Sequence, residues 1–153
     1  MNPDSDSIHP EFRLAKFADL ESIFKVDPTA QREKYRIEII RRAVENGACF
    51  IACSDEVIGY AILEYTFFEM GFMSLLVIHP DRWRTGLGSG LMRHLESICR
   101  TGKIFTSTNQ SNLPMQALLS KLGYERSGII HGLDEGDPEL IFKKEIYQPN
   151  PGI

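Results

Sequence analysis

Apolar residues recur along this chain at two spacings, one typical of helices and one typical of buried strands. Helical spacing predicts a helix that begins near Asp19 and a second helix that stops at Asn46-Gly47. Two later apolar stripes predict helices from Leu87 to about Arg100 and from Leu113 to Leu122. Pro114 near the start of the last helix is a typical helix-start signal.

Short apolar runs bounded by turn residues predict the strands. They cover residues 12–14, 49–53, 58–63, 71–78, 103–106, 124–130 and 139–146. The second and third strands flank a short polar turn at 54–57, which indicates a hairpin. The order is therefore strand, two helices, three strands, then helix and strand twice, with a closing strand. We expect a single domain over residues 12–147, with tails at 1–11 and 148–153.

Composition and charge narrow the class of protein. With 153 residues and a net charge of −4, the chain has the size of one domain and lacks the basic surface of a general nucleic-acid binder. No apolar run approaches the roughly 20 residues of a membrane span, and the polar N-terminus does not resemble a signal peptide. The three cysteines show no metal-ligand spacing. These features favour a cytoplasmic protein with reduced thiols and no metal.

The most informative stretch is His79–Gly90, a basic, glycine-rich loop between a strand and a helix. Backbone N–H groups at the helix start and the positive end of its dipole suit a phosphate or pyrophosphate. Arg82 and Arg84 add full charges for further anionic oxygens. A dinucleotide loop would need glycine at Leu91, and the Gly-Lys-Ser/Thr ending of a Walker loop is missing.

The whole string instead resembles the acetyl-CoA-binding signature of the GNAT N-acetyltransferases, Gln/Arg-x-x-Gly-x-Gly/Ala. Aligning Gly86 and Gly88 with that signature puts Trp83 in the Gln/Arg position. A second segment, Asn112–Tyr124, resembles the family's Asn-x-x-Ala-x-x-Leu-Tyr-x-Lys-x-Gly-Phe. Here Leu119 stands where the family has a tyrosine that often protonates the departing thiolate. The predicted order of elements matches the family from about residue 12 to 147.

The resemblance implies an α/β (α+β) fold, with a mixed central sheet of about seven strands flanked by about four helices. It also implies that backbone amides hold the pyrophosphate of acetyl-CoA and that the coenzyme strand pairs with the pantetheine arm. A freed main-chain N–H, most simply that of Leu76, would stabilise the carbonyl oxygen. Asn112 would contact the pantetheine arm, or it would only cap a helix. The coenzyme residues expected from the resemblance are Leu76, Val77, Ile78, Arg82, Trp83, Arg84, Thr85, Gly86, Leu87, Gly88, Ser89 and Asn112.

An amine must lose a proton before it attacks the thioester. Glu64, near the end of the third strand, and Glu69, just before the fourth, are the candidate bases; each could equally be a solvated carboxylate. His79 could contact phosphate, although capping the turn is the favoured interpretation. Candidate acceptor residues are the aromatic patch Tyr65, Phe67 and Phe68, together with His131, Asp134 and Glu135.

We therefore expect an acyltransferase that moves an acetyl group from acetyl-CoA to the primary amine of a small, cationic molecule. The acidic turn around Asp134 and Glu135 would attract such an amine, or it would serve only for solubility. Two alternatives stay open: a non-catalytic acyl-CoA-binding module and a protein or peptide N-acetyltransferase. No nucleic acid, membrane or metal is expected as a partner, and a homodimer is a possible assembly.

Overall fold

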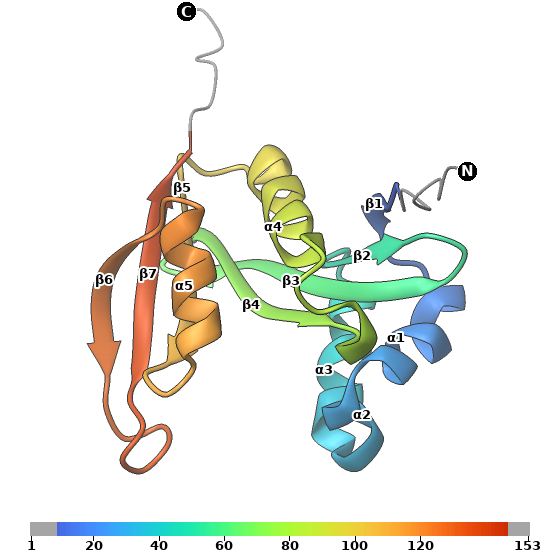
Figure 1. Ribbon diagram of the computed structural model, residues 1–153, viewed down its shortest axis with the longest axis horizontal. Coiled ribbons are helices and arrows are strands. Elements are labelled where there is room, and N and C mark those ends of the chain that lie inside the picture. Colours follow the sequence, from blue (N-terminus) through green and yellow to red (C-terminus); the bar gives the residue numbers. More distant parts are fainter. Residues whose placement is uncertain (1–8, 147–153) are drawn as a thin grey trace, which may run out of the picture. The chain divides into compact units, whose positions relative to one another are not determined.

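The strands form one hydrogen-bonded sheet in a computed structural model that describes residues 9–146 (Figure 1). Its order is β1-β2-β3-β4-β5-β7-β6. The strands are β1 (Glu11–Leu14), β2 (Cys49–Cys53), β3 (Val57–Phe67), β4 (Met70–Ile78), β5 (Lys103–Asn109), β6 (Glu125–Ile130) and β7 (Glu139–Glu145). Parallel pairing of β4 with β5, amid antiparallel neighbours, makes the sheet mixed.

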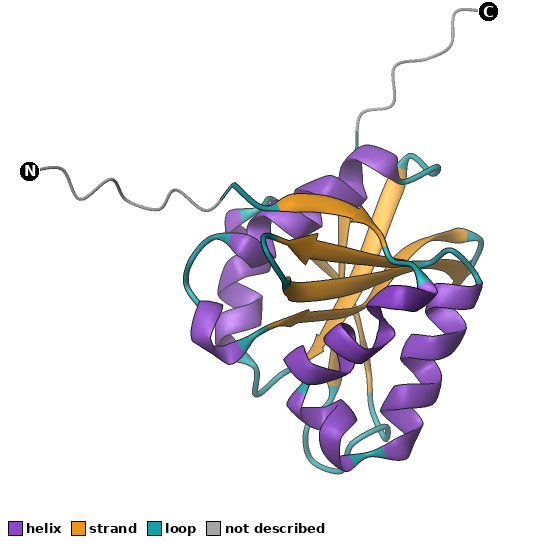
Figure 2. Cartoon of the chain, turned by 90° about the vertical axis from the view of Figure 1, so that its right-hand side faces the viewer, coloured by secondary structure: helices purple, strands orange, loops and turns teal. Residues whose placement is uncertain are grey.

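The described residues contain five α-helices and two short 3₁₀ helices (Figure 2). The helices are α1 (Leu20–Val26), α2 (Pro28–Arg32), α3 (Lys34–Glu45), α4 (Leu87–Ile98) and α5 (Leu113–Lys121), with η1 (Phe17–Asp19) and η2 (Pro80–Arg82). The expected α/β fold with a mixed seven-stranded sheet is confirmed. The helix that sequence patterning missed is α2, which Pro28 and the side chain of Asp27 start.

Contacts between residues divide the chain into two compact units. The N-terminal unit comprises the chain up to Ile62 together with Leu75–Met92, and the C-terminal unit comprises Leu63–Ser74 and the chain from Arg93. Both β3 and β4 contribute to each unit. The predicted tails at 1–11 and 148–153 fall mostly outside the described residues, and Glu11 belongs to β1.

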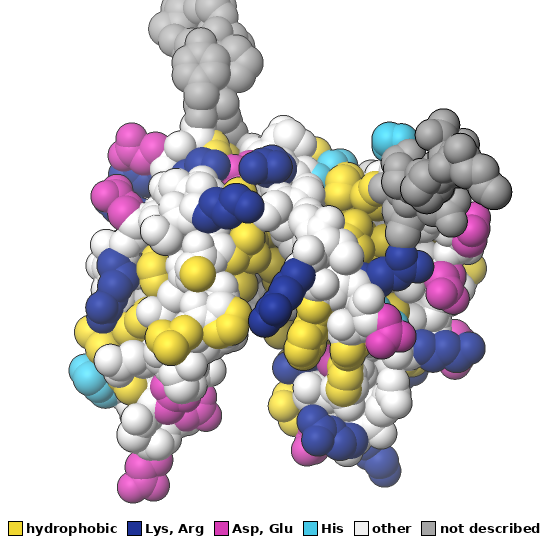
Figure 3. Space-filling view, viewed as in Figure 1, with side chains coloured by type: hydrophobic (Ala, Val, Ile, Leu, Met, Phe, Trp, Pro, Cys, Tyr) yellow, Lys and Arg dark blue, Asp and Glu magenta, His cyan; other side chains and the backbone are white. Residues whose placement is uncertain are grey.

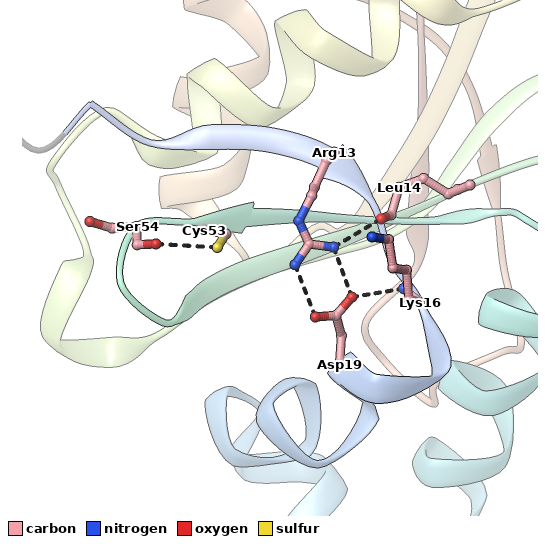
Figure 4. Close-up of polar contacts among 6 residues, drawn as sticks. All are labelled: Arg13, Leu14, Lys16, Asp19, Cys53 and Ser54. Carbon is pink, nitrogen blue, oxygen red and sulfur yellow. Dashed lines mark hydrogen bonds and ion pairs between the residues drawn. The ribbon is translucent and has the colours of Figure 1, made fainter.

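In the N-terminal unit, antiparallel strands β1, β2 and β3 carry a core shared with α1, α2 and α3. One face of α3 supplies Ile40, Ala43 and Val44 to that core, as expected for an amphipathic helix. An ion pair holds β1 to the helical segment that follows it: Arg13 donates to both carboxylate oxygens of Asp19, at 2.8 and 3.0 Å (Figure 4). This bond holds the pKa of Asp19 below its ordinary value.

A buried polar network joins α2, α3 and β3 inside the same unit. The Asp27 side chain accepts hydrogen bonds from the hydroxyl of Tyr60 at 2.5 Å and from Arg36 at 3.0 Å. Asp27 is 1% exposed and Tyr60 fully buried. Burial raises the pKa of the Tyr60 phenol, which therefore stays protonated and keeps donating. The network satisfies a carboxylate that would otherwise be costly to bury.

In the C-terminal unit, β5 and β7 pair over their full described length, and β6 completes the edge. Ile104, Thr106 and Thr108 are buried along one face of β5, and α5 buries Leu119. Cys99, directly after α4, packs at Gly71, where an added Cβ would collide with its Sγ. Glu96 of α4 accepts a 2.6 Å hydrogen bond from Lys144 of β7, which fixes this helix to the sheet.

The tight turn between β3 and β4 consists of Phe68 and Glu69, with φ of 51° and 63°. A two-residue hairpin turn of this kind normally uses Asn-Gly, because a side chain crowds the backbone at positive φ. The chain therefore stores strain at this turn.

Replacing Glu69 with glycine is expected to raise the free energy of unfolding by about 1 kcal/mol, since glycine occupies this conformation without crowding. Glu38→Gly, in the interior of α3, is the control and should lower it by about 1 kcal/mol. Urea unfolding followed by circular dichroism measures both. A destabilised Glu69→Gly variant would contradict the strained turn.

Candidate coenzyme and acceptor site

The segment after β4 is a stiff turn held by its own side chains. His79 donates its backbone N–H to the carbonyl of Ile58 at 2.9 Å, and its Nδ1 accepts from the backbone of Asp81 at 3.1 Å. The capping role of His79 is thereby confirmed. The indole N–H of Trp83 then reaches back to the carbonyl of Ile78 at 2.9 Å, and the Thr85 hydroxyl donates to the carbonyl of Arg82.

The turn enters α4 through left-handed backbone at Arg84 (φ 65°) and Gly86 (φ 84°). The first helical bond runs from the N–H of Gly90 to the carbonyl of Gly86 at 3.0 Å. The backbone N–H groups of Leu87, Gly88 and Ser89 therefore have no partner within the helix. A Cβ at Gly86 would meet nothing within 4 Å, so the space at the residue just before these amides is open. Open space, free amides and flanking arginines suit an anionic group such as a pyrophosphate.

The last part of β4 runs close to β3. A Cβ added to Gly59 would lie 2.7 Å from Cδ1 of Ile78 and 3.0 Å from the carbonyl oxygen of Val77. The parallel pairing of β4 with β5 covers Gly71–Met73 against Ile104–Thr106, at the start of both strands. The main chain from Leu76 to Ile78 therefore lies beyond this pairing. Sequence reasoning did not single out Gly59, because the reason for a glycine there lies in the neighbouring strand.

The structure separates the two candidate bases. The Glu64 side chain is half-buried, and it accepts a 2.8 Å hydrogen bond from Ser74 of β4 and a 3.3 Å bond from Thr66. Glu69 is exposed in the strained β3–β4 turn. Strand alternation puts Ser74 on the same face of β4 as Phe72, opposite to Gly71, which faces Cys99. Sequence reasoning did not pair Ser74 with Glu64, although this alternation was visible.

The predicted aromatic patch lies in the C-terminal unit, where Phe67 and Phe68 contact each other edge to face with ring centroids 5.0 Å apart. Tyr65 lies under the guanidinium of Arg100, 4.2 Å from its ring centre. Phe67 stacks on Phe72 at 4.8 Å and lies 5.3 Å from Phe105. Phe68, at the turn, is 83% exposed. Phe67 and Phe72 therefore form an apolar platform on the strand pair that also carries Glu64 and Ser74.

The β6–β7 hairpin ends in the acidic turn, whose side chains gather at its tip (Figure 3). The carboxylate of Asp134 accepts from Asn109 at 2.8 Å, and the Asp137 carboxylate accepts from the backbone N–H of Ser111 at 3.0 Å. These bonds fasten the turn to the β5–α5 loop. His131 and Glu135 are exposed, and no hydrogen bond to either is recorded in residues 9–146. The anchoring pairs were not foreseen, because their members lie more than 20 residues apart in sequence.

The second sequence segment forms α5, and two of its residues have defined roles. The side-chain oxygen of Asn112 accepts from the backbone of Met115 at 3.2 Å and caps the helix. Its amide N–H groups remain as donors. Leu119 is fully buried and belongs to the core, so this position supplies no proton donor. The neighbouring hydroxyl of Ser120 is exposed.

No described helix could cross a bilayer, since the longest, α3 and α4, have 12 residues each. The described residues also contain no cluster of metal-ligating side chains. All three cysteines are free thiols, as expected.

Comparison with known proteins identifies the family. The model of the acetyltransferase (GNAT) family matches residues 15–124, and the chain belongs to that family. It is similar to a GNAT-family acetyltransferase from Bacillus cereus ATCC 10987, with 35% identity, a TM-score of 0.85, and coverage of 91% of this chain and 99% of that one. A search among curated proteins finds no match.

More distant structures share the fold. The ribosomal-protein-S18-alanine N-acetyltransferase of Escherichia coli is 17% identical, with a TM-score of 0.76 and coverage of 94% of this chain and 98% of that one. The protein yncA from Salmonella typhimurium, solved with its cofactor acetyl-CoA, is 16% identical with a TM-score of 0.72, covering 92% of this chain and 96% of that one. The chain is thus a GNAT acetyltransferase by family and fold.

Replacing Gly86 with valine is expected to lower the affinity for acetyl-CoA at least about tenfold, because a side chain at φ 84° disturbs the turn that presents the amides. Trp83→Gln should cost less, since it restores the residue type usual in the family. Isothermal titration calorimetry measures both. A harmless Gly86→Val change would show that the amides lie elsewhere.

Proposed function

We propose that this acetyltransferase binds acetyl-CoA at the start of α4 and transfers the acetyl group to the primary amine of a small molecule. The observation that carries the proposal is the set of free N–H groups at Leu87–Ser89 beside open space and the arginines of the turn. These amides would hold the pyrophosphate, and Arg82, Arg84 and Thr85 would contact further phosphate oxygens. The main chain of Leu76, Val77 and Ile78 would pair with the pantetheine arm. The side-chain amide of Asn112 would contact an amide carbonyl of the same arm.

The chemistry requires holding the amine against the thioester and removing its proton. Glu64 is the base in this proposal, because its carboxylate is half-buried and oriented by Ser74, whereas Glu69 is exposed. Glu64 takes a proton from the ammonium, directly or through a water, and the neutral amine nitrogen then attacks the carbonyl carbon. The C–N bond forms, the C–S bond breaks, and coenzyme A leaves as the thiolate. The nitrogen gives up its second proton to solvent, and the thiolate takes one up. The N–H of Leu76 stabilises the carbonyl oxygen as it gains charge.

A thiol-release assay with acetyl-CoA and a panel of amines tests the proposal directly. Release that depends on the amine supports transfer, and binding of acetyl-CoA without any release would favour the non-catalytic module instead. Core burial of Leu119, where the family often has a tyrosine, is the observation that favours that second candidate. A panel arm of peptides with free N-termini separates a protein acceptor from a small amine.

We place the protein in the cytoplasm, where acetyl-CoA and small amines are both available.

Glu64→Gln is expected to lower kcat about a hundredfold or more, because the amide cannot accept the ammonium proton. Glu69→Gln is the matched control and should leave kcat within about twofold, since its carboxylate is exposed at the turn. Steady-state thiol release gives kcat, and calorimetry confirms that both variants keep the affinity for acetyl-CoA. A larger loss in Glu69→Gln than in Glu64→Gln would reverse the assignment.

The acidic hairpin tip would favour cationic acceptors over acidic ones. Tyr65, Phe67, Phe68 and His131 would border the acceptor in the same proposal, with Asp134 and Glu135 supplying the negative charge.

A double variant, Asp134→Asn with Glu135→Gln, should raise the apparent KM of a polyamine several-fold at low salt. The asparagine oxygen still accepts from Asn109, so the loop keeps its anchor. The rise should shrink at about 0.5 M salt, where charges are screened. Asp55→Asn with Glu145→Gln removes the same charge elsewhere and serves as the control. Equal KM values for both double variants at low salt would refute the steering role.

A further inference from the structure

Trp83 is the only tryptophan of the chain and stands in the coenzyme turn with its side chain 65% exposed. Exposure of so large a ring is unusual for a side chain without a ligand or partner. The ring is nevertheless anchored, because its N–H donates to the carbonyl of Ile78 at 2.9 Å. One edge is thus fixed to the end of β4 while much of the aromatic surface faces solvent.

That hydrogen bond also removes the only polar group of the side chain from ligand binding. An indole has a single N–H donor and no acceptor. The Gln or Arg usual at this position offers donors to a phosphate, but Trp83 has none left to offer. What remains is a flat aromatic face.

Positive charges flank the ring on both sides in sequence. Arg84 is exposed. Arg82 is half-buried and, together with Glu56 and Asp81, lines a pocket of about 350 Å³. None of the ion pairs among residues 9–146 involves either arginine. Both guanidinium groups are therefore available to phosphate oxygens.

We propose that Trp83 is the stacking platform for the adenine base of the coenzyme. The inference rests on the proposed binding of acetyl-CoA and assigns the ring to one part of that ligand. The adenosine of coenzyme A carries a pyrophosphate at its 5′ carbon and a phosphate at its 3′ carbon. Arg82 and Arg84, on either side of Trp83 in sequence, would bind these phosphates and so bring the nucleoside close to the ring. The flat purine fits the exposed aromatic face, whereas the pantetheine arm is flexible and rich in amides.

The single tryptophan makes the proposal measurable without an acceptor. Emission of the wild-type chain is followed during titration with coenzyme A, adenosine 3′,5′-bisphosphate and 4′-phosphopantetheine. Stacking on the purine should quench emission with the first two ligands and leave it unchanged with the third. Quenching by 4′-phosphopantetheine would overturn the assignment, because that ligand contains no purine.

Affinities of Trp83→Leu and Trp83→Phe provide the second measurement. Calorimetry should show about fivefold weaker binding of coenzyme A to Trp83→Leu, the lower end of the ~1–3 kcal/mol that base–aromatic stacking contributes. Trp83→Phe should keep most of the affinity, because it retains a ring. Tyr35→Leu, which removes an exposed ring on α3, is the control and should leave affinity unchanged.

The outcomes separate this inference from the function on which it rests. Binding of coenzyme A with unchanged Trp83 emission, or equal losses of affinity for coenzyme A and 4′-phosphopantetheine in Trp83→Leu, would overturn the stacking role and leave the acetyltransferase proposal standing. No binding of coenzyme A to the wild-type chain would overturn both.

Discussion

Everything proposed for the coenzyme turn depends on how closely two backbones approach at the end of β4. Glycine at position 59 permits this approach, because a Cβ there would press on the carbonyl oxygen of Val77 and on the side chain of Ile78. The same strand end is held by the bond from His79 to Ile58 and by the indole of Trp83 on the Ile78 carbonyl. The turn therefore leaves the sheet from a fixed point. Fixed amides bind an anion without having to be ordered first, which preserves affinity.

The hydrogen bonds of the β6–β7 hairpin change how its acidity is understood. As a sequence, the turn is a cluster of carboxylates without assigned partners. In the structure, Asp134 binds Asn109 at the end of β5, and Asp137 binds Ser111, the residue before the α5 cap Asn112. The carboxylates thus have a structural role, which is to hold the turn against the loop that leads to Asn112. Glu135, in contrast, is exposed in this turn and takes no part in these anchoring bonds.

Local patterns made much of this fold predictable, and long-range partners made the rest unpredictable. The strand–turn–helix around Gly86 followed from apolar spacing and glycine placement, and Pro114 marked the start of α5. The Asp27–Tyr60 bond joins residues 33 positions apart, and no periodicity relates them. The Glu64–Ser74 pair needed the cross-strand register as well as the alternation. Sequence therefore predicted the strand, turn and helix that we propose for the coenzyme, whereas the preference for Glu64 over Glu69 in the proposed mechanism rests on side-chain contacts.

Leu119 is buried in the core at the position where the family often has a tyrosine. Catalysis without that tyrosine is chemically reasonable when protonation of the leaving thiolate is compared with deprotonation of the amine. An alkyl thiol has a pKa near ~8.5, so its thiolate departs readily close to neutral pH without a strong acid. An alkylammonium has a pKa near ~10.4, so almost all of the acceptor is protonated at the same pH and cannot attack. Deprotonation of the amine is the more demanding step. In the proposed mechanism this step falls to Glu64, which is half-buried and bound to Ser74, and it does not depend on the buried Leu119.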